Sequence, residues 1–173
     1  MRKGQVLENM NGHKKQDIEF RIRQMQIDDL ADVFHLGEKL FTLREYPTLY
    51  RTWDEYEVIG FYTGDPEYCL VAETGGSLAG FLLGSIVDKR NSPRKYGYLV
   101  WFGIDESFQG SGVAELLFDG FRKIMQGEGV STLLVDTAAD NDRALSFFRA
   151  RGFSSPRDHV YLTLNLPGED TRG

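Results

Sequence analysis

The sequence predicts a single α/β domain in which helices cover a mixed β-sheet. The chain has 173 residues, of which 41% are hydrophobic and 27% are charged, and these values fit one domain with one hydrophobic core. Residues 68–104 contain consecutive strand-like segments separated by turns, whereas helical and strand-like segments alternate after residue 104. The first pattern is typical of antiparallel strands, and the second of strand–helix–strand units.

The N-terminal part predicts one strand followed by two helices. Residues 17–25 alternate between apolar and charged side chains, as a strand does. Asp28 and Asp29 then mark the start of a helix with one apolar stripe. The stripe consists of Leu30, Val33, Phe34, Leu40 and Phe41. Pro47 ends this helix, and residues 50–62 are expected to form a second, aromatic-rich helix.

The next segment predicts three antiparallel strands. Residues 68–73 and 78–87 form two of them, joined by a turn at the glycine pair 75–76. A second turn at residues 91–93 leads to a strand over residues 96–104. This third strand is apolar on both faces, which indicates an interior position in the sheet.

The C-terminal part alternates between helices and strands. A helix is predicted for residues 112–126, a buried strand for 133–137, a second helix capped by Asp140 or Asn141, and a closing strand for 160–166. The first helix has one apolar face, made of Val113, Leu116, Leu117, Phe121, Ile124 and Met125. Together these segments complete a mixed sheet with helices on it.

Composition limits the location and the partners of the chain. Residues 1–16 and 168–173 are polar and aperiodic, so we expect tails around one domain spanning 17–167. There is no apolar run of about 18 residues, no secretory signal and only one cysteine, Cys69, which indicates a cytoplasmic protein without a membrane partner. A net charge of −6 argues against nucleic acid and favours cationic ligands. The scattered histidines predict no metal site.

Residues 104–114 carry the most informative pattern. A buried strand ends, glycines 110 and 112 follow, and a helix begins at once. Free N–H groups at a helix start, approached through glycines, can bind a pyrophosphate, although the spacing is equally compatible with an ordinary helix cap. A P-loop is excluded because no Lys-Ser or Lys-Thr pair follows. A dinucleotide site remains open as an alternative, with Glu115 in place of its third glycine and Asp136 as its acid.

The same segment carries a family resemblance. The run Gln109-Gly110-Ser111-Gly112-Val113-Ala114 matches the pattern Gln/Arg-x-x-Gly-x-Gly/Ala at a helix start. Further matches follow in the expected order at residues 22–30, 71–81 and 141–153. Over residues 18–166 the sequence therefore resembles the GNAT superfamily of N-acetyltransferases, whose fold is a mostly antiparallel sheet flanked by about four helices.

The resemblance implies a reaction and a ligand. Acetyl-CoA would donate an acetyl group directly to a primary amine in a ternary complex, and the amine would belong to a small molecule or a protein. The backbone amides of residues 109–114 would hold the CoA pyrophosphate. The pantetheine arm would lie beside Asn141 and pair with the backbone of Phe102, Gly103 and Ile104. A homodimer would also be common for this family.

One mismatch leaves the catalytic groups open. Phe148 stands where the family usually has a tyrosine that protonates the departing thiolate. Three alternatives follow from this mismatch. Another group protonates the thiolate, the thiolate leaves without a proton donor, or the protein is a non-catalytic acyl-CoA sensor. No acid lies on the strand 96–104, so Tyr98 and the nearest carboxylate, Asp136, are the catalytic candidates. The alternatives are a core role for Tyr98 and a carboxylate bonded to backbone for Asp136.

The acceptor side is expected between the first two helices. In the family this region commonly walls the acceptor site, and here its residues 41–53 are rich in aromatic side chains. Together with Glu45, Asp54, Glu55 and Glu57 they could receive a cation. The alternative is that the aromatic residues pack the two helices together while the acids face water.

Overall fold

The computed structural model of the protein describes residues 18–42, 52–88, 94–158, 160, 162 and 164. Its strands are β1 (Arg21–Gln24), β2 (Cys69–Thr74), β3 (Ser77–Asp88), β4 (Lys95–Ile104) and β5 (Thr132–Val135). Its α-helices are α1 (Leu30–Leu40), α2 (Glu55–Gly64), α3 (Val113–Gly127) and α4 (Asp142–Ala150). Short 3-10 helices are η1 (Ile27–Asp29), η2 (Pro66–Tyr68) and η3 (Glu106–Phe108).

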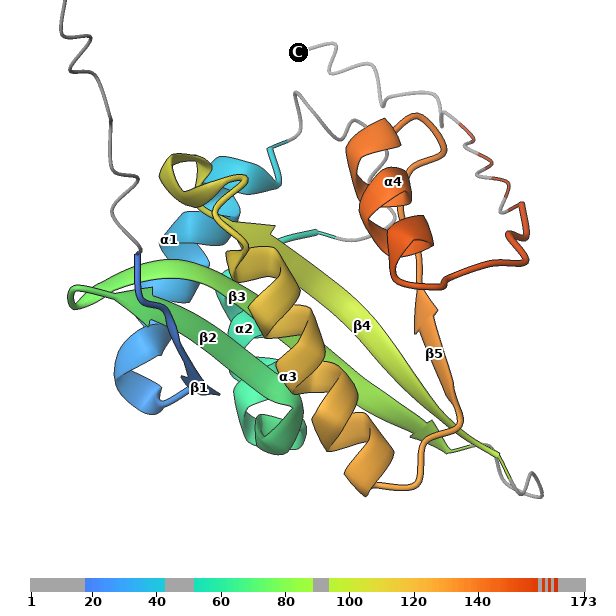
Figure 1. Ribbon diagram of the computed structural model, residues 1–173, viewed down its shortest axis with the longest axis horizontal. Coiled ribbons are helices and arrows are strands. Elements are labelled where there is room, and N and C mark those ends of the chain that lie inside the picture. The colour runs from blue at the N-terminus through green and yellow to red at the C-terminus, as the bar shows by residue number, and fades with distance from the viewer. Residues whose placement is uncertain are drawn as a thin grey trace, which may run out of the picture.

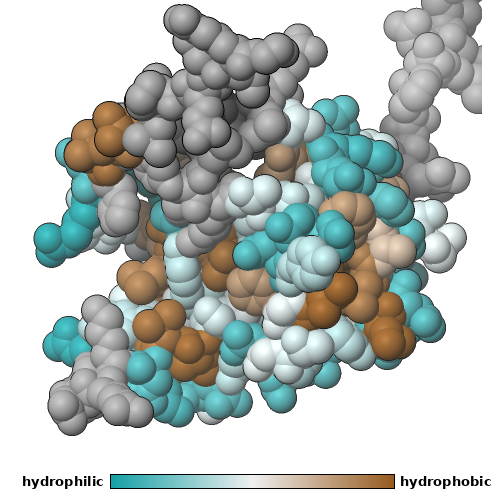
Figure 2. Space-filling model, turned by 180° about the vertical axis from the view of Figure 1, so that it is seen from behind, coloured by the Kyte–Doolittle hydropathy of each residue, from teal (hydrophilic) through white to brown (hydrophobic). Residues whose placement is uncertain are grey.

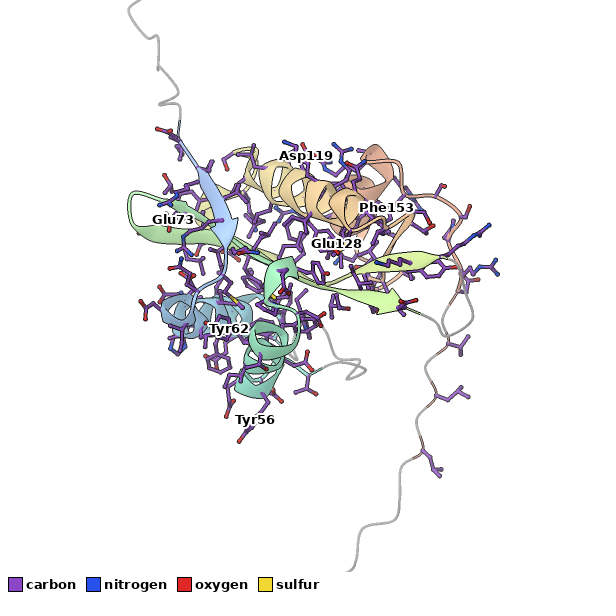
Figure 3. The ribbon with its side chains drawn as sticks, turned by 90° about the horizontal axis from the view of Figure 1, so that it is seen from below. Tyr56, Tyr62, Glu73, Asp119, Glu128 and Phe153 are labelled. Carbon is purple, nitrogen blue, oxygen red and sulfur yellow. The ribbon has the colours of Figure 1, made fainter. Side chains whose placement is uncertain are left out.

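The five strands form one sheet in the order β1-β2-β3-β4-β5. The neighbours from β1 to β4 are antiparallel, whereas β5 runs parallel to β4. Helices α1 and α2 cover one face of the sheet, and α3 and α4 lie on the other (Figures 1 and 3). The predicted α/β class and its mixed, helix-covered sheet are confirmed.

Each face of the sheet has its own core. Helix α3 buries a stripe of five side chains against the sheet: Val113, Leu117, Phe118, Phe121 and Met125. Glycines let the helix approach closely, since a Cβ atom at Gly84 would lie 2.4 Å from the Phe121 ring. The prediction that Leu116 shares this face is wrong; it is 45% exposed, because its position on the helix points away from the centre of the stripe.

The other core joins α1 and α2 to the sheet through Val33, Leu36, Val58, Phe81 and Trp101. Seen from this side, the molecule shows apolar patches between hydrophilic side chains (Figure 2). Helix α2 begins five residues later than predicted, because the Asp54 carboxylate caps it by accepting from the Glu57 N–H at 2.9 Å. The break at Pro47 and the turn at 91–93 lie outside the described residues.

Two predictions for the C-terminal part need correction. Strand β5 was expected to be buried, but Leu134 is 42% exposed, because in the described structure β5 is the last strand of the sheet. The closing strand over 160–166 is wrong for the residues that the structure describes there. Val160, Leu162 and Leu164 belong to no strand, and they are 79–88% exposed. Their alternation fits a strand, but alternation alone does not supply a neighbour to pair with.

Arg23 of β1 forms hydrogen-bonded ion pairs with Asp29 at the start of α1 and with Glu73 of β2. Its guanidinium donates to both carboxylate oxygens of Asp29, at 2.6 and 2.8 Å, and to Glu73 at 2.8 and 3.0 Å. Asp29 also accepts from the backbone N–H of Gln26 at 2.7 Å. The hydrogen bonds from Arg23 hold the pKa values of Asp29 and Glu73 below their usual range.

We expect Arg23→Met to lower the free energy of unfolding by about 1–2 kcal/mol at neutral pH, because the bidentate pair with Asp29 is lost. The folded-state pKa values of Asp29 and Glu73 are depressed, so their contribution is present above the unfolded values of about 4. It disappears as the pH falls through the lower folded values. Urea unfolding should therefore show a smaller difference from wild type at about pH 3.

Arg21→Met is the matched control for this prediction. Arg21 is 75% exposed and reaches Glu73 through one 3.3 Å contact, so its loss should change stability much less. Equal losses in the two variants would show that the described network contributes nothing specific.

Candidate functional site

A β-bulge divides β4 at Val100. Leu83 of β3 lies opposite Trp101, and Gly84 lies opposite Leu99, so Val100 is an extra residue in the ladder. Leu99 packs into the core on the α3 side, whereas Trp101 packs into the core under α1 and α2. The bulge therefore reverses which residues of β4 face each side of the sheet, so that Leu99 and Trp101, two residues apart, face opposite sides.

The sheet opens beyond the bulge. Strand β5 pairs with β4 only from Tyr96↔Thr132 to Leu99↔Val135, and β4 then continues to Ile104 without it. Figure 1 shows the two strands side by side at one end and separate at the other. Among the described residues, no strand pairs with the outer edge of Phe102, Gly103 and Ile104. Such an edge offers backbone groups to an extended ligand that carries amides.

Gly103 has a packing reason to be glycine. A Cβ atom there would lie 2.8 Å from both Leu40 and Phe81 on the α1 side. The family resemblance implies that the backbone of Gly103 pairs with pantetheine, but in the structure it is the packing of Leu40 and Phe81 that leaves no space for a side chain here. Phe102 and Ile104 are half-buried and pack against the α3 core.

The glycine-containing loop follows directly at the end of β4. Gly110 and Gly112 have φ angles of 73° and 91°, and a Cβ atom on either would meet nothing within 4 Å. Gly112 is the N-cap of α3, and Val113 behind it is 1% exposed and fixes the helix start in the core. Gln109 and Ser111 are exposed, and Ala114 is half-buried. The space beside the two glycines is thus open, and the N–H groups that a helix start leaves unpaired suit an anion.

The geometry before the loop is held by a short cap. The Asp105 carboxylate accepts from the Ser107 N–H at 2.9 Å and also from its hydroxyl. These two hydrogen bonds lower the pKa of Asp105. Ser111 donates its hydroxyl to the Phe108 carbonyl at 2.6 Å. The loop is therefore set by its own short-range contacts.

Tyr98 and Asp136 meet at the opening of the sheet. Tyr98 lies opposite Leu134 in the parallel pairing, and Asp136 is the first residue after β5. The Tyr98 hydroxyl donates to Oδ1 of Asp136. Because Gly97 and Leu99 face α3, Tyr98 faces the α1–α2 side. The structure brings the two catalytic candidates together. The Asp136 carboxylate accepts this hydrogen bond from a side chain, that of Tyr98, and not from the backbone.

Helix α4 packs against the second half of β4 through contacts of Phe147 and Phe148 with Phe102. Asn141 caps it by accepting from the Ala144 N–H at 3.1 Å. Phe148 is 7% exposed and packs among Phe102, Phe147 and Phe153, with ring centroids 5.3–6.4 Å apart. The structure thus places Phe148 inside the core beneath α4.

Arg151 was not singled out from the sequence. It stacks 3.7 Å from the centroid of the Phe147 ring and pairs with Glu115 at 2.8 Å. This contact joins the end of α4 to the first turn of α3. The spacing of four residues between Phe147 and Arg151 was visible in the sequence, but the partner on α3 was not.

The predicted acceptor side is partly described. Phe41 and Trp53 pack against each other and against Trp101, with centroids 4.8–5.3 Å apart, so their role in packing the helices is confirmed. Asp54 caps α2, and Glu57 accepts a hydrogen bond from the Trp101 indole N–H at 2.9 Å. Glu55 is exposed, and Glu45 lies outside the described residues.

Two other kinds of feature are absent from the described residues, namely a metal-binding group and a membrane-spanning helix. In the described ranges no three His, Cys, Asp or Glu side chains are grouped so as to hold a metal ion. None of the helices seen there has the length and apolar character needed to cross a membrane.

Comparisons with known proteins agree with this geometry. The acetyltransferase (GNAT) family matches residues 31–153. An acetyltransferase of Yersinia enterocolitica is 27% identical over 131 residues, which are 75% of this chain and 88% of the relative. Ard1 from Thermoplasma volcanium has a similar fold, with a TM-score of 0.67, 22% identity, and 80% and 84% of the two chains covered. The aminoglycoside N-acetyltransferase AAC(6')-Iy in complex with CoA also has a similar fold, with a TM-score of 0.68 and 20% identity. The match covers 86% of this chain and 97% of that chain.

Proposed function

Because the chain belongs to the acetyltransferase (GNAT) family, we propose that it transfers an acetyl group from acetyl-CoA to a primary amine by direct transfer in a ternary complex. Acetyl transfer from acyl-CoA follows from the family. The observation that supports a working site in this chain is the edge of β4 beyond Leu99, with which no described strand pairs and which is followed by the helix start at Gly112. An extended ligand ending in a pyrophosphate fits that sequence of features.

The proposed acetyl-CoA site uses mostly backbone groups. Within residues 109–114, the N–H groups of Gln109 and Ser111 donate to the Glu106 and Phe108 carbonyls at 3.3 Å, so the other N–H groups of this segment bind the pyrophosphate in this proposal. The edge of residues 102–104 pairs with the pantetheine amides. Asn141, at the start of α4, lies beside the pantetheine arm in this proposal, whereas Phe148 is buried among phenylalanine rings and supports the site from within the core. The lack of neighbours around Gly110 and Gly112 supports this assignment, because the space beside them is open to a ligand.

The proposed catalytic groups are Tyr98 and Asp136. An alkylammonium with a pKa of about 10.4 must lose a proton before it attacks, which costs about 4–5 kcal/mol at neutral pH. The Tyr98 oxygen takes the amine proton while its own proton passes to Asp136, along the hydrogen bond between them. The neutral amine nitrogen then bonds to the thioester carbon and the C–S bond breaks. The nitrogen loses its second proton as it becomes the amide, and the departing thiolate takes up that proton.

The acceptor is a molecule with a primary amine, either small or a protein. Both kinds occur among the structural neighbours, which include aminoglycoside acetyltransferases and the NatC complex bound to a Gag peptide. Those proteins are at most 20% identical to this chain, so they support the range of acceptors and do not choose between them.

Thermal denaturation with acetyl-CoA, CoA and NAD, followed by thiol release against a panel of amines, tests the proposal. Ligand at about 100 times its Kd should add about 2.7 kcal/mol to the stability of the protein. We expect stabilisation by the CoA species and thiol release with an amine. Stabilisation without turnover of any amine would favour the acyl-CoA sensor, and stabilisation by NAD alone would favour the dinucleotide-binding domain.

We expect Phe148→Tyr to give no gain in kcat. The added hydroxyl would enter a core of phenylalanine rings and would cost about 1–3 kcal/mol of stability if it found no partner there. Steady-state kinetics beside thermal denaturation measure both effects. A clear rise in kcat would show that the missing hydroxyl at this position limits the wild-type rate, and that Tyr98 does not compensate for it.

A further inference from the structure

We infer that Glu57 of α2 binds a second positive charge on the acceptor, so that the preferred acceptor carries two or more cationic groups. The inference rests on the proposed amine acetylation. It names the class of molecule that the site selects: diamines, polyamines, or polycations with several amines.

Glu57 is held in one orientation by the strand that carries the proposed catalytic tyrosine. Its Oε2 accepts from the indole N–H of Trp101 at 2.9 Å, and Trp101 is 8% exposed. Its neighbour Tyr56 points away from the sheet and is 75% exposed (Figure 3). Glu57 therefore turns toward β4, whereas the side chain that precedes it in α2 turns toward solvent.

The carboxylate has room for another donor. Within the described part of the chain, Glu57 forms no ion pair with a Lys or Arg, and its Oε1 accepts no hydrogen bond. A half-buried carboxylate is only partly hydrated, so an arriving ammonium gains more from it than from a fully exposed acid. An acceptor cation would supply the partner that the protein does not.

The surroundings favour a cation over a neutral group. Trp101 packs against Phe41 and Trp53, with ring centroids 4.8 and 5.0 Å away. Rigid aromatic rings beside a fixed carboxylate attract an ammonium through both charge and ring faces. Because Trp101 already orients Glu57, binding a cation costs little side-chain entropy.

The position of Glu57 suits one end of a molecule whose other end reacts. Tyr98 and Trp101 face the same side of the sheet, on either side of the bulge at Val100. Three residues of a strand separate their Cα atoms by about 10 Å. An acceptor with its reacting amine at Tyr98 can thus reach Glu57 only with a second group several bonds away. A simple monoamine cannot use both positions.

The charge of this layer points the same way. Residues 27–68 contain ten Asp or Glu residues against three Lys or Arg residues, whereas the whole chain has a net charge of −6. The negative charge of the protein is thus concentrated in the segment that carries α1 and α2. A surface of one sign raises the encounter rate of oppositely charged ligands, in a salt-dependent way.

Glu57→Gln tests the inference, with Glu55→Gln as its matched control. Glutamine keeps an oxygen for the Trp101 indole but removes the charge. Glu55 lies in the same helical turn, is exposed, and borders a hollow between α1 and α2. The probes are putrescine, cadaverine and hexamethylenediamine, each paired with the alkylamine of the same carbon number.

We expect wild type to prefer at least one diamine over its alkylamine. In Glu57→Gln, kcat/KM for that diamine should fall about tenfold through a higher KM, while the value for the alkylamine stays within about twofold. Glu55→Gln should leave both values unchanged. Trp101→Phe, which removes the indole N–H and keeps a ring, should cause a smaller loss that is again confined to the diamine.

Two results would overturn the inference. If Glu57→Gln lowers activity equally on diamines and alkylamines while amine acetylation persists, then Glu57 is structural and the proposed function stands. If wild type acetylates no amine, the proposed function fails. Calorimetry with cadaverine then tests separately whether Glu57 binds a cation. Binding by wild type that is lost in Glu57→Gln would support the cation site, and equal or absent binding would remove it.

Discussion

Replacing Gly112 with valine is expected to raise the Kd of acetyl-CoA by about tenfold or more, which corresponds to at least ~1.4 kcal/mol of binding free energy. Gly112 is the N-cap of α3 with a φ of 91°, and within the described residues no atom beyond its chain neighbours lies within 4 Å of the position of a Cβ atom. The new side chain would occupy the open space where the pyrophosphate is proposed to approach the helix start. Calorimetry with acetyl-CoA measures the change.

The same substitution at Gly129 provides the control. Gly129 follows the other end of α3, has a φ of 74°, and also has open space around it. A side chain at a positive φ costs about 1–2 kcal/mol at either position, so both variants should lose similar stability. Only the variant at Gly112 should lose affinity for acetyl-CoA. If the two variants bind alike, the glycine-containing loop does not hold the ligand.

Most helices, strands and turns could be predicted from the sequence, because the patterns that indicate them lie within short segments of the chain. The periodicity of α3 and the turn at glycines 75–76 depend on residues close together in the chain, and both are present as predicted. The loop at 109–114 follows from its own glycines, which adopt the left-handed conformation that other residues rarely take. Leu116 shows the limit of such reasoning. In a helix with many apolar residues, the sequence pattern alone does not decide which of them face the core.

Contacts between distant segments could not be predicted in the same way. The bond between Trp101 and Glu57 spans 44 residues, and the bond between Tyr98 and Asp136 spans 38. The first depends on the bulge at Val100, which alternation in the sequence does not reveal, and the second on the register of two parallel strands. The sequence identified Tyr98 and Asp136 as separate candidates, and only the structure makes them a pair.

That pair leads to the second large effect. We expect Tyr98→Phe to lower kcat by about 10²–10⁴, because the proposed path for the amine proton loses the hydroxyl that connects it to Asp136. Asp136→Asn should cause a loss of similar size, since an amide oxygen can accept the Tyr98 hydrogen bond but cannot take up the proton. The Kd for acetyl-CoA should stay unchanged in both, because neither side chain belongs to the proposed pyrophosphate site. Steady-state kinetics and calorimetry on the same samples separate the two quantities.

The double variant distinguishes a shared proton path from two independent contributions. If Tyr98 and Asp136 act in one path, combining the two changes should lower kcat little further than either alone, as for other groups that act as a unit. Tyr96→Phe is the control, because Tyr96 faces the same side of β4 but pairs with Thr132, at the closed end of the two strands. It should keep nearly full activity. A Tyr98→Phe enzyme as active as this control would show that the proton leaves by another route, with the acetyl-CoA site unaffected by that conclusion.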